Sequence, residues 1–514
     1  MTRSQFPGKR IPRREFIKKS AQGGAVLVAS PVILSSLADA AAGGGGAELT
    51  IQDLGRQDLE RLLEVALSRG GEFAEVYAEQ SAYTRLNLDE DKLKNIQYRV
   101  RQGVGVRVIS DGRSGYAHSA DLSMESLEET ARVASFIASG AAGPAPQTLQ
   151  GGDRPEKYWQ TRQPLDRVIE KDKVALAWRA NQTARDYDPR VIQVRVIYYD
   201  DFREKIVANS RGLWARDRSP QMWMMTSVVA EDGEVRQNGF QSMGGRVGWD
   251  YFDEHTPEDL AREAARQAVV MLTAKAAPSG QMPVVIAAGH GGTMFHESIG
   301  HGLEGDGIYK KLSYYADKLG QRVGSELITV IDDATLMGKR GSLTIDDEGV
   351  PGQRKVLIED GILRGFMHDN LSAMQMDTQS TGNGRRESFR EMAIPRMTNT
   401  FLAPGQDDPE EMIRSTEKGL LVASIGSGQV HTMTGEFVFR VTEAYRIENG
   451  RVTEPVRDAI LIGNGPEVMQ KIDRVGPNLG FTLGFCGKGG QTACVTEGAP
   501  EFRISAITVG GTQV

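Results

Sequence analysis

Four Asp-Gly or Asn-Gly dipeptides that lie between pairs of β-type runs constrain this chain more than any other feature. They are Asp111-Gly112, Asp232-Gly233, Asp360-Gly361 and Asn449-Gly450. Such pairs accept the positive φ angles of two-residue hairpin loops, so each is expected to join neighbouring antiparallel strands. Segments with helical periodicity alternate with the β-type runs around the first two dipeptides, and not around the last two. The chain is therefore predicted to be α+β, a mixed α/β N-terminal domain followed by a mostly antiparallel β C-terminal domain.

The domain organisation is predicted from length and from the distribution of turn-forming residues. At about 150 residues per domain, a chain of 514 residues suggests two or three domains. A Gly/Pro-rich stretch over 139–155 reads as a linker or a long surface loop. We predict a linker at 41–48, an N-terminal α+β domain at 49–139, a central domain at 156–275 and a β-rich C-terminal domain at 276–514.

The amino terminus has the pattern of an export signal. Arg13-Arg14 is followed by Phe16 and two lysines, then by a weakly apolar stretch over 21–37 and small residues at 38–40. Charged, apolar and small-residue regions in that order are typical of a twin-arginine signal peptide, here residues 1–40. The apolar stretch is short and contains Pro31, so no stable membrane span is expected. A periplasmic or other extracytoplasmic location is predicted, with the cytoplasm as the alternative.

Composition excludes one broad class of function. The chain has 61 Lys+Arg and 68 Asp+Glu, a net charge of -7. Without the seven basic and two acidic residues of the first forty, the balance is 54 against 66, or -12. A general nucleic-acid binder needs a basic surface, so no nucleic-acid partner is expected.

Two histidines at an unusual spacing form the candidate reactive centre. The chain has seven histidines, and His296 and His301 lie within six residues, with Glu297 beside the first. The spacing i, i+5 would turn the two side chains roughly 140° apart on an ideal α-helix. Gly300 and Gly302 flank His301 and permit a widened turn or a break. We predict an irregular helix that directs both imidazoles at one metal ion.

Zinc is the expected metal, because imidazole together with thiolate suits it. A catalytic zinc site needs three protein ligands and one open position. The candidates for the third ligand are Cys486, Cys494, Glu304, Asp306, His290 and His431. Cys486 lies in a glycine-rich turn, and Lys488 is expected to help lower the pKa of its thiol. Glu297 is the candidate general base, which would take a proton from water.

Two charged clusters have open interpretations. Arg385-Arg386-Glu387 is either a solvated ion pair or a clamp for a substrate carboxylate. The run Asp346-Asp347-Glu348 is expected to be a solvated turn, since no complete oxygen-ligand loop accompanies it.

Several segments resemble the TldD/PmbA family of metallopeptidases, on its TldD side. The resemblance extends over nearly all of residues 50–514 and rests on six ordered segments: GVGVRVISDGRSGYAHSADLS at 103–123, FHESIGHGLEGD at 295–306, STGNGRRES at 380–388, IPRMTNT at 394–400, GEFVFRVTEAYRIENGRV at 435–452 and FCGKGGQ at 485–491.

The resemblance implies a site, a cofactor and partners. It implies one zinc ion per active subunit, held by His296, His301 and Cys486, with Glu297 as the catalytic acid/base and residues 276–514 as the metallopeptidase domain. It also implies hydrolysis of peptide bonds in small or unfolded polypeptides within an enclosed chamber. The chain would act as a homodimer, or as a heterodimer with a metal-free PmbA-like subunit.

The chain departs from the family pattern in three places. The export signal is atypical of the cytoplasmic members. His431 replaces a small polar residue, which makes it, with Arg385 and Arg386, a candidate substrate-binding residue. Cys494 is an addition, and a disulfide with Cys486 would remove the third ligand. The alternative functions are a non-catalytic maturation or scaffold subunit stabilised by zinc, and a metal amidohydrolase that acts on a non-peptide amide.

Overall fold

The computed structural model describes residues 49–138, 143–154, 157–431 and 433–511. The predicted signal peptide, residues 1–40, and the linker, residues 41–48, lie outside the described residues. In the part of the chain that is described, no helix has the length and apolar character needed to cross a bilayer.

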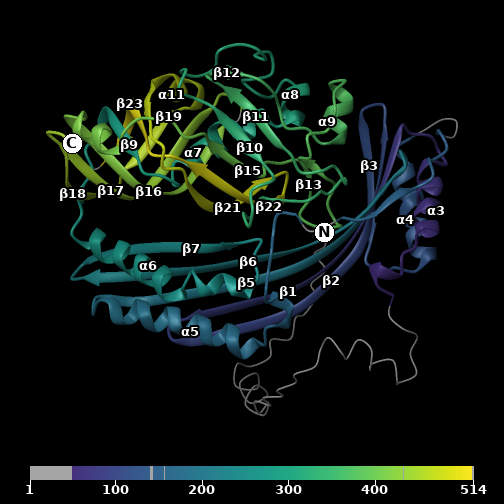
Figure 1. The fold of residues 1–514 in the computed structure, drawn as a ribbon, viewed down its shortest axis with the longest axis horizontal. Coiled ribbons are helices and arrows are strands. Elements are labelled where there is room, and N and C mark those ends of the chain that lie inside the picture. The colour runs from purple at the N-terminus through teal and green to yellow at the C-terminus, as the bar shows by residue number, and fades with distance from the viewer. Residues whose placement is uncertain (1–48, 139–142, 155–156, 432, 512–514) are drawn as a thin grey trace, which may run out of the picture. The chain divides into compact units, whose positions relative to one another are not determined.

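Residues 49–274 build one large sheet with helices packed against it (Figure 1). Among the described residues it has seven strands, six of them in the order β3-β2-β1-β5-β6-β4, and β7 pairs with the same edge of β6 as β4, farther along the strand. The first and the central predicted regions therefore share a sheet, joined where β1 pairs antiparallel with β5. The elements are η2 (Ile51–Asp53), α3 (Arg56–Leu67), β1 (Phe73–Asp89), β2 (Lys92–Ser110), β3 (Arg113–Ser119), α4 (Met124–Ser135), β4 (Gln150–Asp153), η3 (Leu165–Arg167), α5 (Glu170–Tyr187), β5 (Val191–Asn209), β6 (Leu213–Asp232), β7 (Val235–Gly245), η4 (Trp249–Asp253) and α6 (Pro257–Leu272).

The two faces of this sheet differ in chemistry. Ala74, Val76 and Ala78 of β1 pack in a core with α3 and α4, and Leu86 and Leu88 pack in a second core with α5 and α6. All five occupy even positions on one strand, so the helices cover the same face of the sheet. The odd positions present polar and charged side chains to the C-terminal region.

The described residues of 275–510 form two further large sheets and the two-stranded sheet β13-β14 (Figure 1). In the described chain, β16, β9, β23, β19 and β17 pair in sequence, and β17 pairs back with β16, which closes a ring of five strands. A six-stranded sheet, β12-β11-β10-β15-β22-β21, lies beside it. Most pairings are antiparallel, and the α+β prediction is confirmed.

The elements of this region, in chain order, are β8 (Lys275–Ala276), β9 (Gly280–Ile286), α7 (Gly292–Phe295), η5 (His296–Gly300), η6 (His301–Leu303), α8 (Gly305–Tyr309), β10 (Val330–Asp333), β11 (Arg354–Glu359), β12 (Ile362–Leu363), α9 (Asn370–Gln375), β13 (Gly384–Arg385), β14 (Ile394–Pro395), β15 (Asn399–Leu402), α10 (Pro409–Arg414), β16 (Lys418–His431), β17 (Glu436–Glu448), β18 (Arg451–Arg457), β19 (Ile460–Asn464), α11 (Gly465–Lys471), β20 (Ile472–Val475), β21 (Gly480–Lys488), β22 (Gln491–Ala499) and β23 (Phe502–Gly510).

The four predicted hairpin loops all join adjacent antiparallel strands. Both residues have positive φ in Asp111-Gly112, Asp360-Gly361 and Asn449-Gly450. In the fourth, Asp232 ends β6 and pairs with Val235, so the loop itself is Gly233-Glu234. Sequence patterns missed a fifth loop of this kind, Glu90-Asp91, because it contains no glycine although both residues have positive φ.

The prediction that Asp346-Asp347-Glu348 forms a solvated turn is wrong. All three residues are buried where the polar face of the large sheet meets the C-terminal region. Glu348 accepts from Arg107 of β2 at 2.7 Å, and Asp347 accepts from Lys205 of β5 at 2.8 Å. The run is acidic because it neutralises buried cations of the sheet, which a charge pattern alone does not distinguish from a solvated surface.

The buried carboxylate of Asp332, on β10, forms hydrogen bonds or ion pairs with three other segments of the C-terminal region. Asp332 accepts from the backbone N–H of Thr398 at 2.7 Å, from the amide of Asn383 at 2.9 Å, and from the ammonium of Lys355 at 2.9 Å. Burial alone would raise the pKa of Asp332, but Lys355 and the hydrogen-bond donors lower it to about 2.

We predict that Asp332→Asn weakens the fold in a pH-dependent way. The ordinary pKa of Asp is about 3.9, so the ionised carboxylate stabilises the folded state above about pH 4. About 2 kcal/mol of that stabilisation is lost as the pH falls to about 2. The difference in unfolding free energy between wild type and Asp332→Asn, measured in urea, should shrink over this range. Asp317→Asn, at an exposed carboxylate, is the control, and a difference independent of pH would contradict the assignment.

Candidate metal centre

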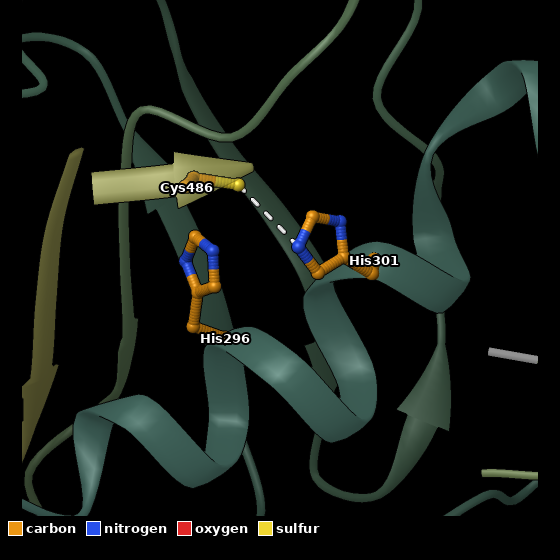
Figure 2. A group of neighbouring side chains, drawn as sticks. All are labelled: His296, His301 and Cys486. Atoms are coloured by element: carbon orange, nitrogen blue, oxygen red, sulfur yellow. Dashed lines mark hydrogen bonds between the residues drawn. The ribbon is translucent and has the colours of Figure 1, made fainter. Parts of the chain in front are cut away.

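The candidate site begins where β9 leaves the closed ring of strands and enters a short irregular helix. One α-helical turn, α7, is followed by a π-helical turn, η5, and then by a 3-10 turn, η6. In the π turn the N–H of His301 donates to the carbonyl of His296, an i→i+5 hydrogen bond. The widened turn brings the two imidazoles to one side, as the i, i+5 spacing predicted (Figure 2).

A strand far along the sequence adds the third donor. Cys486 lies on β21, close to the hairpin loop Gly489-Gly490, where both φ angles are positive. Its Sγ lies 3.3 Å from Nε2 of His301 (Figure 2). The nearest donor atoms of His296, His301 and Cys486 all lie within 4.8 Å of one another. These separations suit three ligands around a single ion.

Glycines around the two histidines permit close packing. A Cβ at Gly292 would lie 2.3 Å from the backbone nitrogen of Gly498 on β22, and one at Gly300 would lie 2.0 Å from Sδ of Met397. Gly300 has ordinary right-handed helical angles, φ -55° and ψ -52°. The structure therefore assigns Gly300 a steric role, whereas the sequence suggested backbone freedom.

Hydrogen bonds fix the orientation of the His301 ring. Nδ1 of His301 lies 2.9 Å from Oε2 of Glu304, which leaves Nε2 directed at the thiol. A carboxylate on the remote nitrogen is the usual partner of a metal-binding imidazole. Glu304 is itself held by Lys488 at 3.0 Å, and the same ammonium contacts Asp306 at 2.6 Å. Glu304 and Asp306 therefore support the site and are outside the three-donor group.

The electrostatics of the group favour a thiolate. Burial would raise the pKa of the Cys486 thiol, but His296 and His301 lower it to about 4. The largest contributions to this lowering come from the two histidines, and the ammonium of Lys488 is paired with Glu304 and Asp306. Burial would likewise lower the pKa of His296, but Cys486 and Glu497 raise it to about 9. A thiolate is the form of cysteine that binds metal.

The donor set fits a divalent metal. The ring of His296 is fully buried, and neither of its nitrogens makes a hydrogen bond. A buried polar group without a partner is costly, and here a cation would satisfy it. Two imidazoles and one thiolate match a catalytic zinc set that keeps a fourth position open.

Glu297 connects this group with solvent. It lines a cleft of about 950 Å³, together with residues of β7, β16 and β21. Its Oε2 lies 3.9 Å from Nε2 of His301, and about a quarter of its side chain is exposed. Burial raises the pKa of Glu297 above its usual value, with Glu497 and Cys486 contributing in the same direction. A carboxylate with a raised pKa beside the group is suited to accept and return a proton.

The other candidate third ligands lie outside the group. Cys494 pairs with Phe485 across the hairpin, while Cys486 pairs with Ala493, so the two thiols point to opposite faces. Both cysteines are free, and no disulfide joins them. Cys494 is half-buried, and its sulfur accepts from Arg340. His290 lines the cleft close to Ser424.

The three candidate substrate-binding residues lie away from the group. His431 is exposed at the end of β16, with Nδ1 3.2 Å from the hydroxyl of Thr434. Arg386 is buried in an ion pair with Glu75. Arg385 donates to the backbone carbonyls of Met397 and Cys494. Their role in substrate binding stays a prediction.

Sequence analysis missed Glu497. Its Oε2 accepts from the hydroxyl of Thr293 at 2.6 Å, and its Oε1 lies 3.8 Å from Nδ1 of His296. The Glu497 carboxylate therefore lies close to His296 and helps raise the pKa of its ring. A single glutamate inside the otherwise uncharged run QTACVTEGA was the available signal.

The irregular helix carries two histidines and a glutamate, and a cysteine thiolate beside an open cleft completes the group. A site of this composition is typical of the class of metallohydrolases. Comparison with known proteins assigns the chain more closely. Three family models match it: PmbA/TldA metallopeptidase domain 1 over 74–138, the central domain over 163–272 and the C-terminal domain over 279–511. The chain belongs to the TldD/PmbA metallopeptidase family.

Curated relatives and solved structures agree with this assignment. The metalloprotease TldD homolog of Haemophilus influenzae is 39% identical over 90% of this chain and 98% of its own. The zinc metalloprotease TldD homolog of Saccharolobus solfataricus is 26% identical, over 88% and 99%. A putative modulator of a DNA gyrase from Thermotoga maritima shares the fold, with a TM-score of 0.73, 22% identity and coverage of 88% and 99%. TldE from Thermococcus kodakarensis also shares it, with a TM-score of 0.69, 21% identity and coverage of 88% and 100%.

We predict that Gly292→Ala disturbs the candidate metal centre. The added Cβ meets backbone of β22, which cannot move as a flexible side chain would. Overpacking of this kind costs about 1–3 kcal/mol, and it should also lower the affinity for divalent metal. Gly487→Ala, beside Cys486 but with open space around its Cβ, is the matched control. Equal stability and equal metal affinity of the two variants would contradict this account.

Proposed function

We propose that this chain is a zinc-dependent peptidase that hydrolyses peptide bonds of small or unfolded polypeptides. The observation that carries the proposal is the position of Glu297, which lines an open cleft beside His296, His301 and Cys486. Family membership supports a metalloprotease, and the name of the Saccharolobus relative supports zinc.

Different residues of the site would bind the metal and transfer the proton. His296, His301 and Cys486 would hold the zinc, with Glu304 orienting His301. When bound, zinc would supply Lewis-acid polarisation of the scissile carbonyl and would acidify water in the site. The Glu297 carboxylate takes a proton from the attacking water and returns it to the nitrogen of the leaving amine. Its raised pKa favours that second transfer.

The cleft accommodates an extended peptide. Its volume of about 950 Å³ is contributed by residues on β7, β16 and β21 as well as by the site helix. Glycines at 426 and 428 on β16 and at 244 on β7 line it, so backbone is accessible to a ligand at these strands. An extended peptide commonly binds by pairing with strand backbone, which requires a segment free of folded structure.

A second family member is proposed as the partner. The fold is shared with TldE, whose name marks the other branch of the family. We infer that the chain acts as a homodimer or as a heterodimer with a metal-free PmbA-like subunit, each active subunit carrying one zinc ion. Sedimentation of the purified chain, alone and with a co-expressed PmbA-like protein, distinguishes the two assemblies.

Glu297→Gln is expected to abolish peptidase activity while zinc content and the unfolding midpoint remain unchanged. Loss of general acid–base catalysis lowers a rate by about 10²–10⁴-fold. Glu326→Gln, at an exposed carboxylate, serves as the control. The measurement is a peptide-library digest together with metal analysis. Unchanged cleavage would exclude this mechanism, and cleavage of simple amides in place of peptides would identify an amidohydrolase.

The two cysteines provide a matched pair for the metal. We expect Cys486→Ala to lose bound zinc and activity, while Cys494→Ala keeps both, because their side chains lie on opposite faces of one hairpin. Chelation of the wild-type protein should abolish activity, and added zinc should restore it. Zinc retained in Cys486→Ala would remove the thiolate from the ligand set. Loss of the fold on chelation without any prior peptidase activity would favour the scaffold function.

We also propose that the first forty residues direct twin-arginine export. Replacement of Arg13 and Arg14 by Lys should retain the protein in the cytoplasm of a host that uses this pathway. Fractionation followed by immunoblotting measures the distribution. Deletion of residues 1–40 is the companion experiment. A wild-type protein that remains in the cytoplasm would leave the cytoplasmic alternative in place.

A further inference from the structure

A second cavity, of about 570 Å³, lies between the polar face of the large sheet and the C-terminal region. Nine Lys or Arg side chains and four Asp or Glu side chains line it. The excess of positive charge contrasts with the chain as a whole, whose net charge is -7. We call this space the arginine cavity.

Part of its positive charge is neutralised within the protein. Lys205 pairs with Asp347, and Arg386 pairs with Glu75. Such pairs explain the buried carboxylates of the interface and leave little charge available for a ligand.

Three buried or half-buried guanidinium groups are not neutralised in this way, whereas Arg85 and Arg99, which also line the cavity and have no ion pair within the described chain, are exposed. Among the described residues, Arg246, Arg340 and Arg385 form no ion pair with a carboxylate. Arg340 is 1% exposed, and its Nε and Nη1 have no hydrogen-bond partner, while Nη2 donates to the sulfur of Cys494 at 3.3 Å. Nε of Arg246 is also without a partner.

Leaving these cations buried and unpaired is unfavourable. Burial lowers the pKa of Arg246 to about 10, while the Asp217 carboxylate opposes this effect and the neighbouring Arg385 adds to it. Burial also lowers the pKa of Arg385. An anion that accepted from the free N–H groups would relieve both the desolvation and the mutual repulsion.

The arginine cavity adjoins the cleft of the metal centre. Phe485 lines both spaces, with the guanidinium of Arg340 3.7 Å from its ring centroid and Trp223 5.1 Å away on the sheet side. Lys339, next to Arg340 in sequence, lines the metal-side cleft. Phe485 therefore lies between a ligand chain in that cleft and the guanidinium of Arg340.

We propose that the arginine cavity binds a carboxylate of the polypeptide substrate, from an acidic side chain or the C-terminus, through Arg246, Arg340 and Arg385. The proposal rests on the proposed function and specifies its substrate class as peptides with an acidic group to one side of the scissile bond. Nε and Nη1 of Arg340 and Nε of Arg246, which have no partner among the described residues, can each donate to a carboxylate oxygen.

The test measures binding, so that it does not depend on hydrolysis. Zinc-loaded Glu297→Gln protein is titrated with fluorescent peptides of one sequence that end in a carboxylate or an amide, and that carry Glu or Gln at one internal position. We expect at least one acid-to-neutral replacement to weaken binding by about 10-fold or more, as loss of a charged hydrogen-bond partner does. The position of that replacement identifies the source of the carboxylate.

Variants locate the effect. Arg246→Gln and Arg385→Gln should each reduce the preference for the charged peptide, whereas Arg262→Gln, at an exposed arginine on α6, should keep it. Cys494 provides a second readout, because its sulfur contacts Arg340. The charged peptide should slow alkylation of Cys494 by iodoacetamide, as followed by peptide mass mapping.

Three results would overturn the proposal. They are equal affinity for charged and neutral peptides, a preference unaffected by Arg246→Gln and Arg385→Gln, and protection of Cys494 by inorganic phosphate but by no peptide. Failure of the proposed function has a different signature. Folded, zinc-loaded wild-type protein that cleaves no peptide, together with a carboxylate preference in binding, would refute the peptidase and leave the arginine cavity assigned.

Discussion

One widened helical turn is the constraint on which the candidate metal centre depends. The hydrogen bond from His301 N–H to the carbonyl of His296 places both imidazoles on one side of the helix. The helix packs closely on both sides of this contact, because Gly292 of α7 lies against the backbone of β22 and Gly300 of the π turn lies against Met397, with no room for a Cβ at either position. A π turn is less favourable by itself than an α-helical turn, and the contacts with neighbouring elements stabilise it here. Because β21 pairs with β22, the contact of the helix with β22 also sets the position of the Cys486 thiolate.

A second constraint is the charged interface between the large sheet and the C-terminal region. The helix-covered face of the sheet is apolar, but the other face meets the rest of the protein through Glu75–Arg386, Arg107–Glu348 and Lys205–Asp347. Such buried pairs add little net stability compared with apolar packing, and they are costly to break. They restrict how the two regions fit together. The same interface contains the arginine cavity, where cations exceed carboxylates.

Much of the fold was predictable from local patterns. Hairpin loops at Asp111-Gly112 and Asn449-Gly450 depend on two residues that tolerate positive φ, and the structure has both. The Glu90-Asp91 loop was not predictable in this way, since neither residue is strongly selected for that conformation. The burial of Asp346 and its neighbours was also missed, because their partners lie more than a hundred residues away in the chain.

The sequence by itself determined the chemistry available: two histidines at i, i+5, the glutamate beside them and the cysteine in a glycine-rich segment, together with a resemblance to one family. These are local properties of residue type and spacing. Only the tertiary structure decided which sulfur faces the imidazoles, because the alternation of β21 and β22 turns Cys486 inward and Cys494 away. It also decided that Glu497 supports His296 and that unpaired arginines gather beside the cleft. Contacts between strands distant in sequence set these outcomes, and no local pattern encodes them.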